Sequence, residues 1–252
     1  MSDLKKRLLN HERNKHIVYD PEPHTYTYFP SGDKRKTTEA IKFNGITSWF
    51  GKYASPFDAD AIAKSCNKNP NSEYYQMGED AIKEQWNQQR IKGDNIHKVI
   101  EDSINLDGVY DEEYGFYIDQ FWDVMFDNNL KPFVSEFVVY DEDIERATPI
   151  DVLATNEDGQ VVPIDIKTYR KDLTYTGYNG KKMKHPLGGI YESKYSSVCL
   201  QISIERKWLL SKYGFKENEL HDGYVAVLND NGCKLIPTLD YINFVDLMYE
   251  YE

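Results

Sequence analysis

The stretch Val161-Val-Pro-Ile-Asp165-Ile-Lys167-Thr168 places an acid and a lysine inside an apolar run that is typical of a β-strand. Side chains at positions i and i+2 of a strand share one face, so Asp165 and Lys167 point the same way. Apolar residues on both sides of the acid indicate a central strand, where an unpaired carboxylate is costly. Two interpretations remain open: a structural salt bridge between Asp165 and Lys167, or a site that binds a metal ion.

Two further acids occupy the strand-like segments upstream. Asp151 lies in Thr148-Pro-Ile-Asp151-Val-Leu-Ala, and Glu136 lies in Val134-Ser-Glu136-Phe-Val-Val. Each of these two acids lies either on the solvent-exposed face of its strand or in a functional site. If the strands around Asp151 and Asp165 pair as a hairpin, Asp151 joins Asp165 and Lys167. Two carboxylates and a lysine at one point are the minimal equipment for metal-assisted phosphodiester cleavage.

Hydrophobic periodicity predicts helices first and then a β-meander, a helix and a second hairpin. The expected strands span 131–140, 148–155 and 160–168, and a Gly-, Tyr- and Lys-rich loop follows over 169–193. Before them we expect a hairpin over 16–29, a helix that begins with Ser55 as its N-cap, helical structure over 72–105 in one piece or two broken near Gly93, and a helix over 111–129. After them we expect a helix over 195–213 and a hairpin over 221–238. The fold class is therefore α/β, with a mixed sheet flanked by helices.

Two predicted helices carry polar side chains that suit a site. Gly93, His97 and Glu101 are spaced four apart and share one helical face. Glycine is unfavourable in a helix, so Gly93 indicates a close approach to a neighbouring element. His97 and Glu101 form either a surface pair or part of a site, and Gln201, on the helix over 195–213, is either solvated or part of the same site.

The order of these motifs resembles the PD-(D/E)xK nuclease superfamily in its RecB-like branch. The resemblance covers about residues 93–229: a G-x3-H-x3-E helix, strands with Glu136, Asp151 and D-x-K, a long loop, and a helix with Gln201. The segments His24-Thr-Tyr26, Gly45-Ile-Thr-Ser48 and Ala61-Ile-Ala63 are similar to the opening of phage exonucleases related to the mitochondrial genome maintenance exonuclease. The resemblance implies a restriction-endonuclease-like core over 93–252, with a mostly helical N-terminal extension over 1–92 packed on it.

The resemblance also implies the metal site and the catalytic roles. Asp151, Asp165, the Ile166 carbonyl and His97 would bind one or two Mg²⁺ or Mn²⁺ ions. Lys167 would orient the attacking water or stabilise the transition state. The remaining catalytic residues would be Glu136, which supports the metal shell, and Gln201, which positions the loop or the DNA backbone. Two departures affect the DNA side: Glu205 stands where the family has tyrosine, and Pro149-Ile150 replaces a pair that often contains glycine.

The loop after Thr168 is the candidate DNA contact. Residues 168–194 carry a local charge of +4 although the whole chain carries −12, which argues against a generic nucleic-acid coat or packaging role. Lysines and tyrosines suit backbone tracking and base stacking on a single strand, although a plain surface loop is the alternative. The expected DNA-binding residues are Arg170, Lys171, Tyr175, Lys181, Lys182 and Lys184.

The composition of the chain bears on its cofactors and on its location in the cell. Three dispersed cysteines cannot form an iron–sulfur cluster or a four-cysteine zinc site, and they fit a reducing compartment. Neither a membrane-spanning run nor a signal peptide is evident, so we expect a cytoplasmic protein, in the host cytoplasm if it is viral. We expect a metal-dependent DNA exonuclease acting on single-stranded or free-ended DNA in phage replication or recombination, with proteins of those processes as its partners. The alternatives are a structure-specific endonuclease on the same core and a DNA-binding or assembly protein without catalysis.

Overall fold

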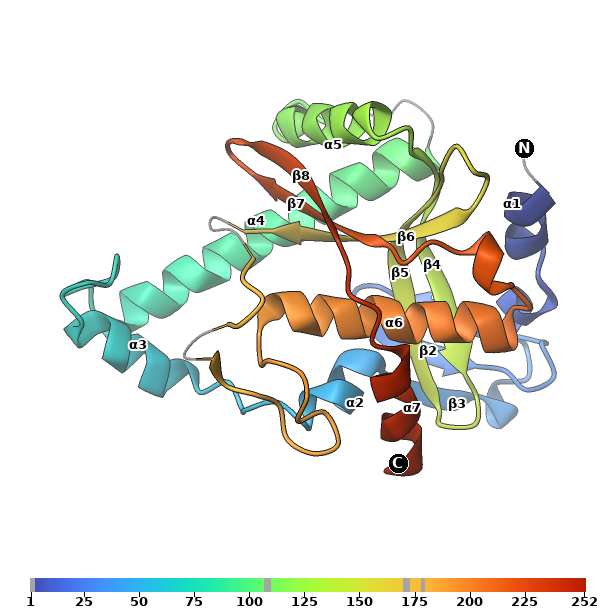
Figure 1. The fold of residues 1–252 in the computed structure, drawn as a ribbon, viewed down its shortest axis with the longest axis horizontal. Coiled ribbons are helices and arrows are strands. Elements are labelled where there is room, and N and C mark those ends of the chain that lie inside the picture. Colours follow the sequence, from blue (N-terminus) through green and yellow to red (C-terminus); the bar gives the residue numbers. More distant parts are fainter. Residues whose placement is uncertain (1–2, 107–109, 170–172, 178–179) are drawn as a thin grey trace.

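A mixed β-sheet runs through the molecule (Figure 1). The computed structural model describes residues 3–106, 110–169, 173–177 and 180–252. In this described part the sheet contains eight strands. Their bounds are β1 Ile17–Asp20, β2 Thr25–Tyr28, β3 Ile41–Gly45, β4 Lys131–Asp141, β5 Arg146–Thr155, β6 Val161–Thr168, β7 Tyr224–Asn229 and β8 Gly232–Pro237.

Helices cover both faces of the sheet (Figure 1). Their bounds are α1 Asp3–Leu9, α2 Ile46–Gly51, α3 Ala59–Lys68, α4 Glu79–Asn105, α5 Gly115–Asp127, α6 Lys194–Lys212 and α7 Ile242–Glu250, with short 3₁₀ turns at Glu12–Lys15, Thr37–Glu39 and Glu217–Glu219. The expected mixed sheet flanked by helices is therefore confirmed. No helix of the described residues is long and apolar enough to cross a membrane.

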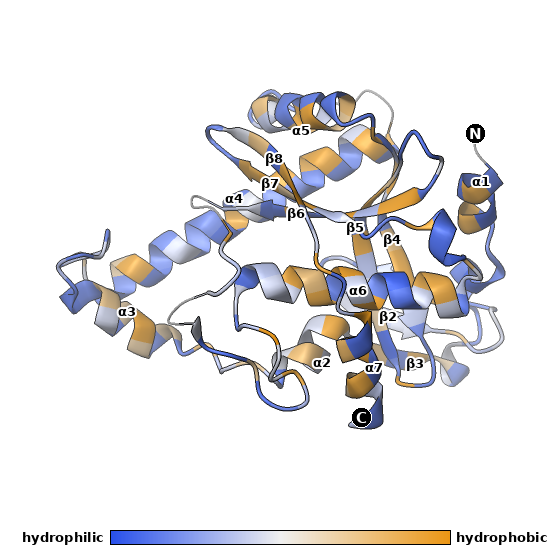
Figure 2. Cartoon of the chain, viewed as in Figure 1, coloured by the Kyte–Doolittle hydropathy of each residue, from blue (hydrophilic) through white to orange (hydrophobic). Residues whose placement is uncertain are grey.

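Hydrophobic cores hold the helices against both faces of the sheet. On one face, apolar side chains of α4 and α5 pack against Val162, Ile164 and Ile166 of β6. On the other face, α2, α6 and α7 form a core with β4 and β5. Figure 2 shows hydrophobic segments alternating with hydrophilic ones along α5 and α6. Helix α6 is buried on most of its sides, because the sheet covers one side and α7 and α2 cover others. A polar residue on α6 is therefore held inside the protein.

The sheet opens along one edge of β5. Strand β5 pairs with β4 along most of its length, with β6 only over Val152–Thr155, and with β3 only at Arg146 and Ala147. Among the described strands, residues 148–151 thus have ladder partners on the β4 side alone. Pro149 lies in this segment and has no backbone N–H to donate. The gap between β6 and β3 leaves room for side chains at the ends of both strands.

Three expectations for the helices are corrected. The segment over 72–105 forms one unbroken helix from Glu79, which runs through Gly93. Helix α3 is capped by Asp58, which accepts a 2.9 Å hydrogen bond from Ala61 N, because both polar groups of Ser55 are bound instead by the Glu192 carboxylate. The helix expected over 111–129 is shorter and spans Gly115–Asp127.

The N-terminal region contributes strands as well as helices. Strands β1 and β2 form the expected hairpin, and β3 joins them to the main sheet through a parallel contact with β5. The boundary expected at residues 92 and 93 falls inside α4. The division into two domains stays a prediction.

Candidate active site at the opening of the sheet

Asp165 and Lys167 form a close ion pair on the α6 side of β6. Lys167 Nζ lies 2.8 Å from Asp165 Oδ1 and 2.7 Å from Oδ2, and it donates a 3.1 Å hydrogen bond to the Ile166 carbonyl. Asp165 is 1 % exposed, and its Oδ2 accepts no hydrogen bond of normal geometry despite its contact with Nζ. The period-2 geometry of the strand explains why the two side chains meet.

Asp151 joins the two strands where their ladder ends. Its Oδ2 accepts a 2.8 Å hydrogen bond from the Ile166 backbone N–H and lies 3.8 Å from His97 Nδ1. The last ladder pair of β5 and β6 is Val152 with Ile164, so the carboxylate occupies the position at which the strands separate. Three of the expected metal-site residues, His97, Asp151 and Ile166, therefore meet at the gap.

Glu136 has an unusual backbone conformation. Its φ is +55°, in the left-handed region that a residue with a Cβ rarely adopts inside a strand. The register of β4 and β5 places Glu136 opposite Asp151, and Asn105 bonds both backbone groups of the preceding Ser135. Burial, followed by the charges of Asp151 and Glu101, raises the pKa of Glu136 to about 8. Lys98 and Lys167 oppose this shift only in part, so the charged form of Glu136 is disfavoured.

Helix α6 contributes a fourth acid, Glu205, which the sequence did not single out as a site residue. Gln201 Nε2 donates a 3.1 Å hydrogen bond to Glu205 Oε1, and Glu205 is 1 % exposed. Burial, then the charges of Asp165 and Asp151, raises the pKa of Glu205 well above its usual range. The spacing from Gln201 to Glu205 is one helical turn, so a polar pair on this otherwise buried helix was the available signal.

Around Lys167, carboxylates outnumber cations. Lys167 is the cation that the buried carboxylates share, and burial would lower its pKa, but Asp165 and Asp151 more than offset this and raise it. Burial also raises the pKa of Asp165, with Asp151 adding to the effect and Lys167 opposing it. Within electrostatic range of Lys167 are four carboxylates, those of Glu136, Asp151, Asp165 and Glu205.

This donor set fits a hard divalent cation in its chemistry. Carboxylates and a backbone carbonyl are the ligands that Mg²⁺ and Mn²⁺ prefer, and burial lowers the pKa of His97, which keeps its imidazole neutral and able to bind a metal. In the arrangement described, however, no three His, Cys, Asp or Glu side chains of residues 3–106, 110–169, 173–177 and 180–252 are grouped as a finished metal site. Asp165 is held by Lys167, and Asp151 is held by Ile166 and His97.

Gly93 permits the contact between α4 and β6. A Cβ atom at Gly93 would lie 2.7 Å from Thr168 Oγ1, closer than side chains normally approach. Thr168 follows Lys167 directly, and His97 lies one turn after Gly93 on α4. The glycine therefore sets how near His97 comes to Asp151, which fits the close approach that the sequence indicates.

Aromatic contacts join the described residues of the basic loop to one another and to the start of α6. Lys182 Nζ lies 5.3 Å from the ring centre of Tyr191, and Tyr175 contacts both Tyr191 and Tyr195. Lys181 bonds Ser55 and lies 3.8 Å from Glu192. The side chain of Lys184 is exposed. The other two expected DNA contacts, Arg170 and Lys171, lie outside the described residues.

The structure adds a lysine to this surface. Lys194 Nζ lies 4.2 Å from the ring centre of Tyr169, and burial lowers the pKa of Lys194. Tyr169 is close enough to Lys167 and Asp165 for both charges to act on its pKa, which burial raises. Lys194 and Tyr169 therefore connect the start of α6 to the end of β6.

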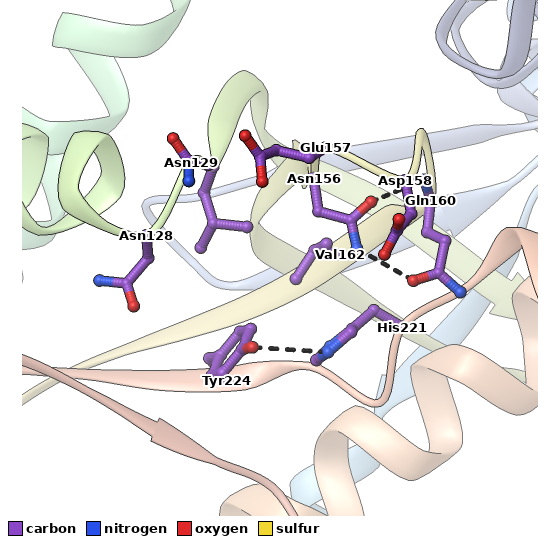
Figure 3. Close-up of a pocket in the computed structure, with 10 residues that line it drawn as sticks. Asn128, Asn129, Asn156, Glu157, Asp158, Gln160, Val162, His221 and Tyr224 are labelled. Atoms are coloured by element: carbon purple, nitrogen blue, oxygen red, sulfur yellow. Dashed lines mark hydrogen bonds between the residues drawn. The ribbon is translucent and has the colours of Figure 1, made fainter.

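A separate polar cavity of about 250 Å³ lies at the other end of the β5–β6 hairpin (Figure 3). His221 and Tyr224 line it from the start of β7, and the turn between β5 and β6 lines it opposite. None of the expected site residues borders this cavity. The cluster of carboxylates around Lys167 therefore lies apart from this cavity.

Comparison with known proteins assigns the chain to no group. No model of a known protein family matches it, and no characterised protein is significantly similar to it in sequence.

Proposed function

We propose that the protein is a metal-dependent DNA nuclease that cleaves phosphodiester bonds at the opening between β5 and β6. The observation that carries the proposal is the meeting of Asp151, Asp165 and Lys167, three residues from two strands, among buried carboxylates that one lysine does not neutralise. The element order also supports it, because two helices, three antiparallel strands, a further helix and a parallel strand follow each other from α4 to β7.

The cluster would hold one or two Mg²⁺ or Mn²⁺ ions through Asp151, Asp165, the Ile166 carbonyl and His97. A bound divalent ion supplies charge neutralisation at the phosphate and a more acidic water. Lys167 then stabilises negative charge on the phosphate or orients the nucleophilic water, and Glu136 supports the ion from behind Asp151. Gln201, anchored on Glu205, is placed to position the loop or the DNA backbone.

The substrate is DNA that enters along the loop after Thr168. Lys182 lies beside Tyr191 and Lys194 beside Tyr169, and Lys184 adds an exposed positive charge. Neighbouring cations and rings suit a single strand. We propose an exonuclease that acts on free or single-stranded ends in viral replication or recombination. Its environment would be the cytoplasm, and proteins of those processes would be its partners.

The test uses end-labelled DNA, single- and double-stranded, linear and circular, with Mg²⁺, Mn²⁺ or EDTA. The full chain should release labelled products from linear DNA with a divalent ion and none with EDTA. Asp165→Asn and Lys167→Ala should abolish cleavage while thermal unfolding stays cooperative. Asp246→Asn and Lys207→Ala, which break an exposed Lys–Asp pair between α6 and α7, are the matched controls and should retain activity. Turnover by purified Asp165→Asn overturns the proposal, and cleavage of circular DNA replaces the exonuclease with an endonuclease.

A further inference from the structure

The ladder between β4 and β5 is interrupted at two acids of the site. Pairs on both sides keep one register, but the pair of Glu136 with Asp151 is missing from the ladder of these described strands. Glu136 has its left-handed φ of +55° at this point. The Ser135 hydroxyl supplies a link instead, because its Oγ donates a 2.5 Å hydrogen bond to the Asp151 carbonyl. A side chain therefore joins the two strands where their ladder is interrupted.

Asn105, the last residue of α4, holds this serine in place. Its Oδ1 accepts a 3.1 Å hydrogen bond from the Ser135 N–H, and its Nδ2 donates a 3.4 Å hydrogen bond to the Ser135 carbonyl. One amide thus pairs with both backbone groups of a residue, as a neighbouring strand does. Ser135 is buried and Asn105 is exposed, so the amide can be removed without opening a cavity in the core.

These bonds form a continuous chain from α4 to β6. The Asn105 amide binds the Ser135 backbone, and the Ser135 hydroxyl binds the Asp151 carbonyl. Asp151 Oδ2 in turn accepts a 2.8 Å hydrogen bond from the Ile166 N–H. His97 lies on the same helix as Asn105, about two turns before it. The proposed metal ligands therefore lie on three elements that one chain of hydrogen bonds joins.

We propose that Asn105 and Ser135 are positioning residues that hold Asp151 and Glu136 in place for the divalent ion. This inference rests on the proposed nuclease function, because it concerns the same ion. Neither residue is itself a ligand, since the amide and the hydroxyl are both bonded to the backbone. A residue such as Glu136 keeps a left-handed conformation inside a strand only where surrounding contacts hold it. The serine before it, fixed by the amide, provides such contacts.

The first measurement is the affinity of the metal-free full chain for Mn²⁺, from isothermal titration. We expect Asn105→Ala and Ser135→Ala each to weaken Mn²⁺ binding by about 10-fold or more, because residues that orient metal ligands commonly contribute this much. Ser135→Thr keeps the hydroxyl and should bind Mn²⁺ within a few-fold of wild type. Because the two residues act as one unit, the double variant should bind no more weakly than the weaker single variant.

The second measurement separates positioning from a loss of folded protein. At low Mn²⁺, Asn105→Ala should cleave end-labelled single-stranded DNA slowly. Excess Mn²⁺ should restore most of kcat, while KM for DNA stays at the wild-type value. A loss of stability alone would lower the folded fraction and leave the Mn²⁺ dependence of the folded protein unchanged.

Asn14→Ala and Thr238→Val are the matched controls. Asn14 Nδ2 donates to the Leu8 and Leu9 carbonyls, and Thr238 Oγ1 donates to the Asp222 carbonyl at 2.6 Å. Each control thus removes a comparable bond from a side chain to the backbone, and none of the bonded partners belongs to the proposed site. Both controls should bind Mn²⁺ as wild type does.

Three results would overturn the positioning role: wild-type Mn²⁺ affinity in Asn105→Ala and Ser135→Ala, equal weakening in the controls, or losses that add in the double variant. If Asn105→Ala does not fold, Ser135→Ala decides alone, because it removes one oxygen and leaves both bonds from Asn105. Under any of these results, cleavage by the wild-type protein still supports the nuclease. A wild-type protein that neither binds Mn²⁺ nor cleaves DNA overturns the nuclease and the positioning role with it.

Discussion

The backbone N–H of Ile166 donates a 2.8 Å hydrogen bond to Asp151 Oδ2, at the point where the ladder between β5 and β6 has ended. One carboxylate thus closes the sheet and supplies charge to the site, and two substitutions separate these tasks. Asp151→Asn keeps an acceptor oxygen for Ile166 but loses the charge. Asp151→Ala loses both and leaves a part-buried N–H without a partner, which costs about 1–3 kcal/mol.

We therefore expect Asp151→Asn to unfold in urea near the wild-type midpoint and to lack nuclease activity. Asp151→Ala should also be inactive and should lose about 1–3 kcal/mol of unfolding free energy. Equal stability of the two variants would show that the bond from Ile166 does not hold the strands together.

Local sequence patterns suffice for the strands that carry the site. The apolar, β-branched runs around Asp151 and Asp165 predict β5 and β6 to within two residues at each end, and the period of two correctly brings Asp165 and Lys167 together. Helix α6 follows equally from its pattern. These features are determined by residues close together in the sequence. They can therefore be predicted without knowledge of the tertiary structure.

The features that sequence patterns missed depend on partners far along the chain. The joining of β3 to β5 involves residues about 100 positions apart and leaves no local signal. The left-handed backbone of Glu136 likewise has no local signal in the sequence. Ser55 has the residue type of an N-cap, yet Glu192 occupies its polar groups and the helix starts later. Competition from tertiary contacts decides such cases.

The fit between Gly93 and Thr168 predicts an unusual response to an alanine. In an open helix position Gly→Ala stabilises by up to about 1 kcal/mol, but the new Cβ here would lie 2.7 Å from Thr168 Oγ1. Gly93→Ala should therefore gain less stability than that. We also expect it to lower kcat/KM by about 10-fold, because moving α4 away from β6 shifts His97, and a small misplacement in a site costs up to 10²-fold.

A substitution at Thr168 tests whether the contact with residue 93 causes the loss of activity. Thr168→Ala removes the hydroxyl, so the double variant Gly93→Ala/Thr168→Ala should recover most of the activity. Gly51→Ala is the control, because nothing lies within 4 Å of a Cβ built at Gly51. Wild-type kcat/KM in Gly93→Ala alone would contradict a role of the glycine in setting the site.

The loop lysines predict a salt-dependent loss of DNA affinity. Each phosphate contact to a single strand contributes about 0.7 to the slope of log K against log salt. Replacing Lys182 and Lys184 by alanine should weaken binding of labelled oligothymidine and reduce the slope by about 1.4. Titrations of the inactive Asp165→Asn protein between about 50 and 200 mM salt measure both quantities. Alanine at the exposed Lys34 and Lys36 changes net charge equally and should leave the slope unchanged.

Glu205 predicts how the metal-free protein depends on pH. Its folded-state pKa is raised well above its usual range by burial and by Asp165 and Asp151. The stability linked to its proton is fully present below its unfolded pKa, near 4.5, and is lost as pH rises through the folded pKa. Glu205→Gln does not ionise, so in EDTA its unfolding free energy should exceed that of wild type increasingly from pH 5 to pH 9.

Glu142 is a control for which the unfolding free energy depends on pH in the opposite direction. Its hydrogen-bonded pair with Arg13 lowers its pKa to about 2, so its stabilisation is present above about pH 4.5 and is lost as pH falls toward 2. Glu142→Gln should therefore be less stable than wild type at neutral pH, whereas Glu205→Gln should be more stable there. Urea unfolding of both variants across the pH range gives the two differences. If Glu205→Gln runs parallel to wild type, the pKa of Glu205 is not raised in the folded protein, and Glu205 is not the buried, uncompensated acid on which the proposed metal binding draws.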